Sequence, residues 1–463
     1  MAPESHNDAA LSARLDRLPG CWAVWRLVIL LSLGGCFEFY DLFLTAYLSP
    51  GLEAAGIFRK GAACPFGLSD QASFAAVTFG GLFVGTIAFA QVADRFGRRA
   101  IFTGSLLWYS AMTLAMSCQS TAPGLDVWRF LAGIGIGVEL VTIDSYLAEL
   151  VPKRFRGRAF AVNQAIQFLA VPAVGLICAA LVPIAPFGVA GWRWVVVIGA
   201  AGALVVWRLR RALPESPRWL VQKGRNAEAA RIVAAIESQS AAQTRGPLPP
   251  PALGADEPQM KGHLREMFQP PLRSRTLMLA VFNFFQTVGF YGFGNWVPKL
   301  IEANGVDVLH SLRYSVAIAL AYPVGPLLCT LFADRFERKW QIVAAAIATA
   351  AFGLLFARQS APAMLIVLGV LITLSNNLLS FAYHAYQAEL FPTRIRARAV
   401  GFVYSWSRLS TVFTSFMIGF FLDRFGTAGV FGFIAISMGV VCVSIGVFGP
   451  RTRSLALEEI AVK

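Results

Sequence analysis

Apolar residues dominate twelve stretches of this chain, and each stretch is long enough to cross the hydrocarbon core of a bilayer as a helix. Such a helix needs about 20 consecutive, mostly apolar residues. The stretches lie at residues 23–48, 71–92, 100–118, 124–148, 158–183, 191–210, 276–298, 311–332, 341–358, 362–387, 399–422 and 428–448. The pattern predicts an all-α membrane protein with twelve transmembrane helices, six on each side of a polar segment.

The polar segment at 212–274 divides the chain into three expected parts. Within it, residues 226–238 have the spacing of an amphipathic helix, and the proline-rich residues 246–258 are expected to form a tether. We therefore expect an N-terminal six-helix bundle with a short tail at 1–211 and a cytoplasmic linker at 212–274. A C-terminal six-helix bundle with its tail follows at 275–463.

Composition and charge agree with this topology. Hydrophobic residues make up 56% of the chain and charged residues 14%, against about 25% charged in an ordinary soluble domain. The net charge of +14 comes from basic clusters in alternate loops, which predicts a cytoplasmic side rather than a nucleic-acid partner. The clusters lie at 95–99, 153–158, 208–231, 335–339, 394–398 and 451–453. Both termini should then be cytoplasmic in a multi-pass protein of a bacterial inner membrane.

Two motifs recur with the same offset. The pattern DRFGRR begins at Asp94 and returns as DRFERK at Asp334, and ELVP at Glu149 returns as ELFP at Glu389, in both cases 240 residues later. A shared offset indicates an internal duplication. Duplicated halves around a site at the bilayer midplane are typical of secondary transporters.

The charged residues of these repeats are expected to form ion-pair networks that hold the cytoplasmic side shut while the protein is open to the outside. Single surface pairs are weak, so a network is required. The residues are Asp94, Arg98, Glu149 and Arg156 in the first half and Asp334, Arg338, Glu389 and Arg396 in the second. In the second copy Glu337 stands where the first has Gly97, which predicts a looser lock there.

No motif in the chain predicts enzyme chemistry, a cofactor or a metal site. The glycine run Gly133–Gly137 lacks the spacing of a nucleotide-binding loop and lies in an apolar stretch, where small residues allow close helix packing. There is no Walker A lysine motif, so ATP hydrolysis is not expected. The seven cysteines lack metal-ligand spacing. A disulfide between Cys64 and Cys118, on the same predicted side, stays open.

These motifs together resemble the major facilitator superfamily, over nearly the whole chain. The sequence PESPRWL at 214–220 and the order of Arg129, the glycine run and Glu149 resemble its sugar-porter-like group. The resemblance implies two pseudo-symmetric six-helix bundles and transport by alternating access. Ala90 departs from the glycine that usually begins the first loop motif, and GPRTR at 449–453 departs from the usual sugar-porter ending.

The substrate branch is less clear from the motifs. The stretch YGFGNWVP at 291–298, GVEL at 137–140 and Arg408 resemble carriers of organic acids and nicotinate-like molecules. The span-seven glutamine pattern of hexose carriers is replaced here by FQTVGFY at 285–291, whereas Asn163 and Gln164 are sugar-like. We favour a small organic acid, aromatic acids included, and keep a sugar or polyol as the alternative.

Three ionisable residues are predicted to couple transport to protons. Glu38 and Asp41 share a helix face at i and i+3, and neighbouring carboxylates can raise one another's pKa. The resemblance implies that Asp41 is the proton-carrying aspartate and that Arg129 is its partner. The alternative is a static ion pair that holds the first and fourth spans together.

Arg408 is predicted to set the charge of the substrate. It lies ten residues past Arg398, about 15 Å into the bilayer, where an arginine needs an anionic or polar partner. That partner is either a substrate carboxylate or, structurally, one of Glu139, Glu38 and Asp41. The other expected substrate-binding residues are Glu139, Gln164, Gln286, Tyr291, Trp296, Asn376, Asn377 and Trp406.

The sequence therefore predicts a proton-coupled symporter of a small organic acid. Its expected partners are the substrate, protons and the lipid bilayer, and a monomer is expected. An uncoupled facilitator, an exporter and a membrane receptor that transports nothing remain alternatives.

Overall fold

A computed structural model describes residues 11, 13–59, 69–89, 96–210, 213–244, 248–251, 263–332, 336–392 and 395–452. These residues form helices joined by turns, with no strand among them. The first half contains α2 (Trp22–Ala54), α3 (Asp70–Phe89), α5 (Arg98–Ser117), α6 (Ala122–Leu150), α7 (Arg156–Phe168), α8 (Ala170–Leu181) and α9 (Gly191–Arg210). The linker contributes α10 (Pro217–Gln222) and α11 (Asn226–Thr244). The second half contains α12 (Leu272–Gly294), α13 (Val297–Ala303), α14 (Val308–Ala319), α15 (Ala321–Phe332), α16 (Arg338–Phe356), α17 (Pro362–Glu389) and α18 (Arg396–Phe448).

In the described parts of the chain these helices supply the twelve predicted passes. The pairs α7–α8 and α14–α15 each form one broken pass, and α18 forms two passes around Gly426, which has a positive φ of 63°. Among the described residues, seven helical stretches are long and apolar enough to cross a membrane by length and composition alone.

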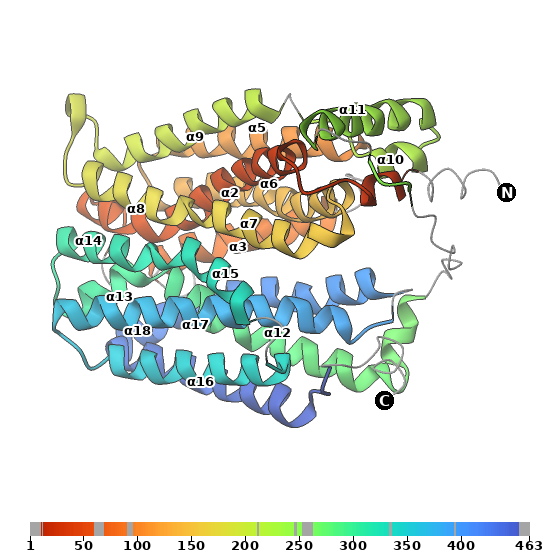
Figure 1. Cartoon of the computed structure of the whole chain (residues 1–463). Coiled ribbons are helices and arrows are strands. Elements are labelled where there is room, and N and C mark those ends of the chain that lie inside the picture. The colour runs from red at the N-terminus through yellow and green to blue at the C-terminus, as the bar shows by residue number, and fades with distance from the viewer. Residues whose placement is uncertain are drawn as a thin grey trace.

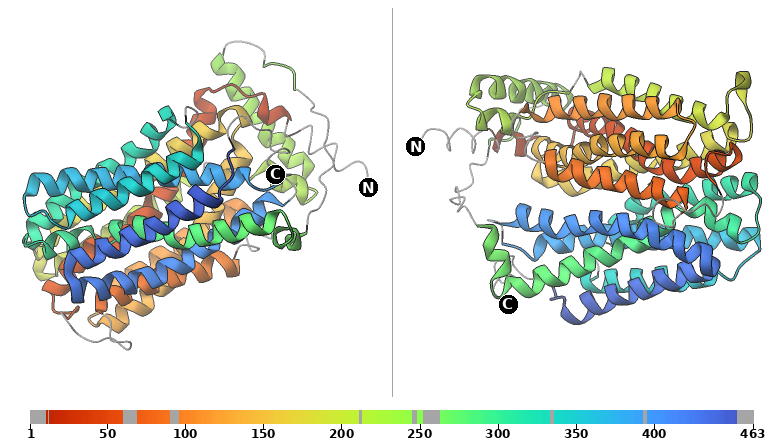
Figure 2. Two further views of the ribbon diagram at one scale, coloured as in Figure 1. Left: turned by 90° about the horizontal axis from the view of Figure 1, so that it is seen from below. Right: turned by 180° about the vertical axis from the view of Figure 1, so that it is seen from behind.

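The two halves lie side by side as two layers of roughly parallel rods (Figure 1; Figure 2, right). The linker helices α10 and α11 lie at one end of the bundle, near the start of α2. This end carries the basic loops and is therefore expected to face the cytoplasm. We call it the cytoplasmic end and the opposite end the outer end. The fold class predicted from the sequence is confirmed, whereas the residue boundaries of the three parts stay a prediction.

Backbone-to-backbone contact explains the glycine run in α6. A Cβ atom on Gly81 of α3 would lie 2.1 Å from the carbonyl oxygen of Phe130, and one on Gly137 would lie 2.2 Å from that of Leu82. Only glycine leaves room for such close approach, so the run packs α6 against α3. The interpretation of this run as helix packing is therefore supported by the geometry.

The break between α14 and α15 lies a few residues before Pro323 and Pro326. Pro326 has no N–H to donate to the carbonyl of Tyr322, one turn earlier in α15. The side chain of Asn377 in α17 donates to this carbonyl at 3.3 Å and to that of Ala321 at 3.5 Å. Because an unpaired backbone group is costly inside a bilayer, Asn377 stabilises the broken pass.

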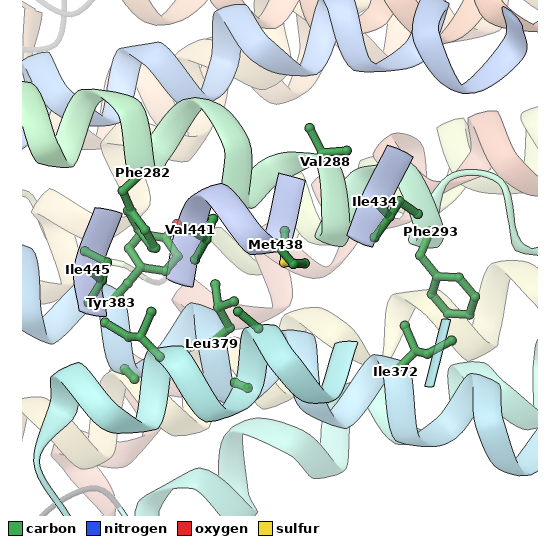
Figure 3. Close-up of a cluster of buried hydrophobic side chains, with 14 of the residues drawn as sticks. Phe282, Val288, Phe293, Ile372, Leu379, Tyr383, Ile434, Met438, Val441 and Ile445 are labelled. Atoms are coloured by element: carbon green, nitrogen blue, oxygen red, sulfur yellow. The ribbon is translucent and has the colours of Figure 1, made fainter. Parts of the chain in front are cut away.

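A large apolar core fills the second half. It lies between α12, α16, α17 and α18, and Figure 3 shows the Phe282 side chain directed toward Tyr383 and Val441. A separate apolar cluster at the cytoplasmic end joins the N-terminal residues Leu11, Leu15 and Leu18 to α10 and α11. The amphipathic helix predicted at 226–238 is present and extends to Thr244. Of the predicted tether at 246–258, residues 246, 247 and 252–258 lie outside the described residues.

Candidate functional site

Asp41 and Arg129 form a buried ion pair at the centre of the first half. The Arg129 Nη1 atom lies 3.0 Å from the Asp41 Oδ2 atom, and neither side chain reaches solvent appreciably, with exposed fractions of 0% and 5%. The hydroxyl of Thr113 in α5 donates to the two carboxylate oxygens at 3.2 and 3.3 Å. The pair predicted between the first and fourth spans is therefore formed in the structure.

Arg129 also donates to acceptors that do not titrate. Its Nε atom donates to the Thr78 hydroxyl at 3.0 Å, and Nη2 donates to the Thr45 hydroxyl at 2.8 Å and to the backbone carbonyl of Asp41. A buried charge that loses its partner is strongly destabilising. Here these other acceptors would keep the guanidinium hydrogen-bonded when the Asp41 carboxylate takes up a proton. The geometry is therefore compatible with reversible protonation.

Two further carboxylates are buried near the midplane. Glu38 on α2 and Glu139 on α6 both have an exposed fraction of 0%. Glu38 lies within electrostatic range of the Tyr291 hydroxyl of the second half.

Arg408 lies in α18 with 5% of its surface exposed, as a buried cation of the second half. Its Nη1 atom donates to the Tyr291 hydroxyl at 3.2 Å and its Nη2 atom to the Tyr404 hydroxyl at 3.1 Å. The guanidinium also lies 5.0 Å from the centre of the Tyr404 ring. Among the described residues no carboxylate lies within ion-pair distance of Arg408, so the structural pairing with Glu139, Glu38 or Asp41 is not formed in this conformation.

This arrangement can bind an anion. The Tyr291 oxygen accepts from Arg408, which leaves its O–H to donate elsewhere, whereas the Tyr404 hydroxyl is also hydrogen-bonded with Tyr383. The guanidinium keeps further N–H groups, because only two of its five are used in these bonds. A carboxylate beside Arg408 would thus meet a permanent positive charge and several hydrogen-bond donors.

Aromatic rings and a histidine surround the Arg408 guanidinium. His384 stacks on Tyr383 with ring centroids 4.1 Å apart and an interplanar angle of 30°, and it lies 5.6 Å from the Tyr404 ring. Its Nδ1 atom lies 2.7 Å from the Ser380 carbonyl. A carbonyl can only accept, so Nδ1 carries the hydrogen, and in the neutral ring Nε2 is left as an acceptor. His384 thus has a satisfied nitrogen and an available one.

The predicted amide residues fall into two groups. Asn376 bonds the Gly289 carbonyl of α12 at 3.2 Å and Thr349 of α16 at 3.4 Å, and Asn377 supports the broken α15, so both hold helices together. Gln164 is half-buried and Gln286 is buried, and neither amide has a hydrogen-bond partner among the described residues. Only the two glutamines therefore retain amides that a ligand could use.

The two predicted tryptophans are not brought to Arg408. Trp296 precedes α13, is 2% exposed and belongs to the apolar core of the second half. Trp406 lies two residues before Arg408, and a helix turns about 200° over two residues, so it points from the opposite face of α18. It is 38% exposed there.

An aromatic layer that the sequence pattern did not predict joins the two halves. Its rings meet edge to face or stacked, with centroids 4.9–6.4 Å apart across the interface. The cross-half ring pairs are Phe43–Tyr322, Phe79–Tyr291, Phe168–Phe290 and Phe168–Tyr322. Because Tyr291 belongs both to this layer and to the Arg408 group, a bound ligand would touch the contact between the halves.

The predicted cytoplasmic pairs form inside each half. Arg98 lies 3.2 Å from Glu149, joining α5 to α6, and Arg338 pairs with Glu389, joining α16 to α17. Arg156 has two buried guanidinium nitrogens without a hydrogen-bond partner among the described residues, and Arg396 donates to the Phe391 carbonyl at 3.2 Å. Asp94 and Asp334, like Cys64 of the suggested disulfide, lie outside the described residues.

Comparison with known proteins gives consistent matches. The family model described as Sugar (and other) transporter matches residues 27–463. A Bacillus subtilis protein named as a metabolite transport protein, YyaJ, is 32% identical over 457 residues, which cover 97% of both chains. The niacin transporter NiaP of Acinetobacter baylyi is 25% identical over 453 residues, covering 98% of this chain and 100% of that one.

Solved structures of the xylose transporter XylE from E. coli share the fold. The partially occluded, inward-open form has a TM-score of 0.73 at 18% identity and covers 94% of this chain and 100% of that one. A second structure, whose title names it a proton:xylose symporter, has a TM-score of 0.70 at 20% identity and covers 94% and 98%.

Proposed function

The chain belongs to the Sugar (and other) transporter family of the major facilitator superfamily, and on that premise we propose that it carries a small organic acid together with protons. It is a membrane transporter and not an enzyme. Transport proceeds by alternating access across a bacterial inner membrane. One chain contains both halves, so a monomer suffices, and the basic loops favour cytoplasmic termini.

The observation that carries the substrate class is the environment of Arg408. A buried guanidinium near the midplane is held by two neutral tyrosine hydroxyls instead of a carboxylate. Arginine keeps its charge even when buried, so the site favours an anion that can accept several hydrogen bonds. The rings of Tyr291, Tyr404 and His384 favour a planar body for that anion.

The buried pair Asp41–Arg129 supports proton coupling. Arg129 has three acceptors besides the Asp41 carboxylate, so protonation of Asp41 leaves no unpaired guanidinium. The named proton symporter among the structural neighbours carries xylose, and the named niacin transporter among the relatives carries a pyridine carboxylic acid. The first name favours a proton-coupled carrier, and the second favours an organic-acid substrate.

A neutral sugar is the second candidate. It is favoured by the amides of Gln164 and Gln286, which lack partners among the described residues, and by the xylose carriers of the same fold. The two candidates differ in one chemical respect, since only the acid needs the charge of Arg408.

Thermal-shift measurements on the purified protein test this choice. Nicotinate and benzoate should raise the melting temperature, because a ligand that binds only the folded state stabilises it. Nicotinamide, which has nearly the same shape without the charge, and xylose should give much smaller shifts. A shift by xylose alone would favour the sugar candidate, and equal shifts by nicotinate and nicotinamide would contradict the role of Arg408.

A substitution pair locates the binding site. Arg408→Lys keeps the charge and loses the two-pronged donor face, so nicotinate affinity should fall about tenfold or more. Arg275→Lys is the matched control, because Arg275 is another buried arginine of the second half whose bond goes to the Leu390 carbonyl. Equal affinity in both variants would exclude Arg408 from the site.

Proteoliposomes then test the transport mode. Uptake of labelled substrate driven by an inwardly directed proton gradient, with protons moving alongside, is expected. Uptake without proton movement would favour a facilitator, extrusion an exporter, and binding without uptake a receptor.

A further inference from the structure

Polar contacts between the two halves lie at the outer end of the described structure. The Tyr47 hydroxyl of α2 lies 3.4 Å from the Ser315 carbonyl of α14, and Lys299 of α13 pairs with Glu53 in the last turn of α2. Both contacts join helices from different halves. The pairs at the cytoplasmic end, Arg98–Glu149 and Arg338–Glu389, do not.

Lys299 sits among three carboxylates from three helices. Besides Glu53, it lies 3.3 Å from Glu302, one turn further along α13. Asp423 of α18 is close enough to interact electrostatically with both Lys299 and Glu53. The side chains of Lys299, Glu53 and Glu302 are 20%, 14% and 12% exposed, so the group is partly shielded from solvent. Shielding makes such a pair stronger than one on an open surface.

The division of these acids between the halves has a consequence. Glu53 belongs to the first half, whereas Glu302 and Asp423 belong to the same half as Lys299. When the outer ends of the halves separate, Lys299 would lose Glu53 but keep two carboxylates nearby. Its charge is therefore never left without a partner, which lowers the free-energy cost of separation.

We propose that the Glu53–Lys299 pair is the outer lock of this transporter. It closes the outer side while the protein is open to the cytoplasm, and it breaks, with Lys299 remaining beside Glu302 and Asp423, when the protein opens outward. The aromatic layer beneath it separates at the same step, since its ring pairs also cross the halves. The inference rests on transport by alternating access and is independent of the substrate's identity.

Accessibility of Ser315 from outside tests the lock. Ser315 is fully buried beside Tyr47, and its carbonyl takes part in the other cross-half contact. Ser315→Cys, in a background in which the seven cysteines are replaced, is labelled in right-side-out vesicles with a membrane-impermeant maleimide. Glu53→Gln should raise the labelling rate about two- to fivefold, the range expected for loss of one partly shielded ion pair.

Glu302→Gln is the matched control. It removes a carboxylate from Lys299 within one half and leaves the cross-half pair, so labelling should not rise and can fall. Lys299→Gln should raise labelling as Glu53→Gln does, and the double variant should be no more labelled than either single variant, because both break the same pair.

The outcomes separate clearly. Unchanged labelling in Glu53→Gln, an equal rise in Glu302→Gln, or additive effects in the double variant would each overturn the proposal. A melting temperature within a few degrees of the parent, measured for every variant, excludes general destabilisation as the cause of a rise. Because labelling needs no substrate, failure of the lock is distinguishable from failure of the organic-acid assignment, which the ligand-binding measurements decide.

Discussion

The two ends of this transporter use ion pairs differently. At the cytoplasmic end Arg98–Glu149 ties α5 to α6 and Arg338–Glu389 ties α16 to α17, each within one half. At the outer end Glu53–Lys299 joins the two halves. An ion pair that stays inside a bundle stabilises that bundle in every state of the cycle, whereas a pair between bundles stabilises only the states in which they touch. In this conformation, location relative to the division between halves therefore distinguishes pairs that hold one half together from the pair that joins both. The gating role predicted for the cytoplasmic residues stays a prediction.

The strongest challenge to this division is Asp41–Arg129, which lies within the first half and is proposed to act in transport. Asp41→Asn should abolish accumulation of substrate against its gradient, because the proton-carrying group is removed. Counterflow exchange should persist, since exchange requires no net proton movement. The measurement is uptake and counterflow in the same proteoliposomes.

The opposite result would mean that Asp41–Arg129 is no exception to the difference between pairs within one half and the pair between halves. If Asp41→Asn still accumulates substrate and only lowers the melting temperature, the pair is a structural tie like those at the cytoplasmic end. The matched control is Thr113→Val, which removes a hydrogen bond to the same carboxylate while leaving it titratable. That variant should retain uphill uptake.

The cytoplasmic pairs provide the next test. Glu149→Gln and Glu389→Gln should each lower the free energy of unfolding by about 1–2 kcal/mol, because each leaves a partly buried arginine without its carboxylate. Thermal unfolding in detergent measures the loss. Neither variant should alter labelling of Ser315→Cys from outside. A rise similar to that of Glu53→Gln would show that these pairs gate the transporter as well.

How much of this was predictable depends on the kind of contact. Arg98–Glu149 and Arg338–Glu389 follow from the repeat, because a duplicated motif brings the same helices together in both halves. The pairing of Asp41 with Arg129 was implied by the family resemblance, and their burial in apolar spans requires a partner. These contacts depend on one bundle's own packing.

Contacts between the halves were not predictable in the same way. Glu53 and Lys299 lie at helix ends where a charge is ordinary, and no local pattern reports how two bundles meet. The aromatic layer was missed for the same reason, since single phenylalanines in apolar spans carry no signal. Helix geometry alone would have predicted two further details. Trp406 must lie on the face of α18 opposite Arg408, and Pro326 must leave the Tyr322 carbonyl without its helical N–H donor.

The two cytoplasmic loops differ from each other in an instructive way. In the first half, Glu215 follows α9 and its Oε1 atom accepts the backbone N–H groups of Arg98 and Arg99 at 3.1 and 3.2 Å, at the start of α5. A side chain at Gly97 would collide with it, since a Cβ atom there would lie 2.6 Å from Glu215 Oε2. The loop therefore requires glycine because the acid comes from the segment after α9.

In the second half the carboxylate at this contact comes from the N-terminus of α16, and not from the segment after the last helix of that half. Glu337 occupies the position of Gly97, and its carboxylate accepts the backbone N–H of Thr452 at 2.9 Å. Tyr386 donates to the Pro450 carbonyl at 2.7 Å, as Tyr146 does to Pro214 in the first half. The residue after Pro450 is Arg451 where the first half has Glu215. The second loop thus has the charge exchanged between its two sides, and the looser lock predicted from Glu337 stays a prediction.

Moving the carboxylate from position 337 to position 451 tests this exchange of charge between the two sides of the loop. Glu337→Gly should lower stability by about 1 kcal/mol, the usual net contribution of one hydrogen bond, and should speed hydrogen exchange in peptides covering 446–452. Glu337→Gly with Arg451→Glu should restore both, because the second half would then have the arrangement of the first. Failure of the double variant to recover would mean that the two substitutions are independent departures.

The smallest expected effect concerns the N-terminal segment at the cytoplasmic end. Burial raises the pKa of Glu237 in α11, but hydrogen bonds from Arg14 and Arg17, at 2.6–3.2 Å, outweigh burial and leave this pKa below its ordinary value. A carboxyl whose pKa is lowered on docking contributes stability above its ordinary pKa, about 4.3, and loses that contribution as pH falls through the lowered value.

Docking of residues 13–18 onto α11 should therefore be complete at neutral pH and weaken only on acidification below about pH 4. Hydrogen exchange of peptides covering these residues, corrected for the intrinsic pH dependence of exchange, measures it. Glu237→Gln should reproduce the acid effect at pH 7, at a cost of about 1 kcal/mol or less. Glu228→Gln, which breaks a pair with Arg225 on the exposed side of the linker, is the control and should have no effect on these peptides.

Because this segment contacts only the first half and the linker among the described residues, Glu237→Gln should leave the outer labelling of Ser315→Cys unchanged. A change in that labelling would mean that a contact within one half at the cytoplasmic end reaches the outer lock, and the distinction between the two ends would fail.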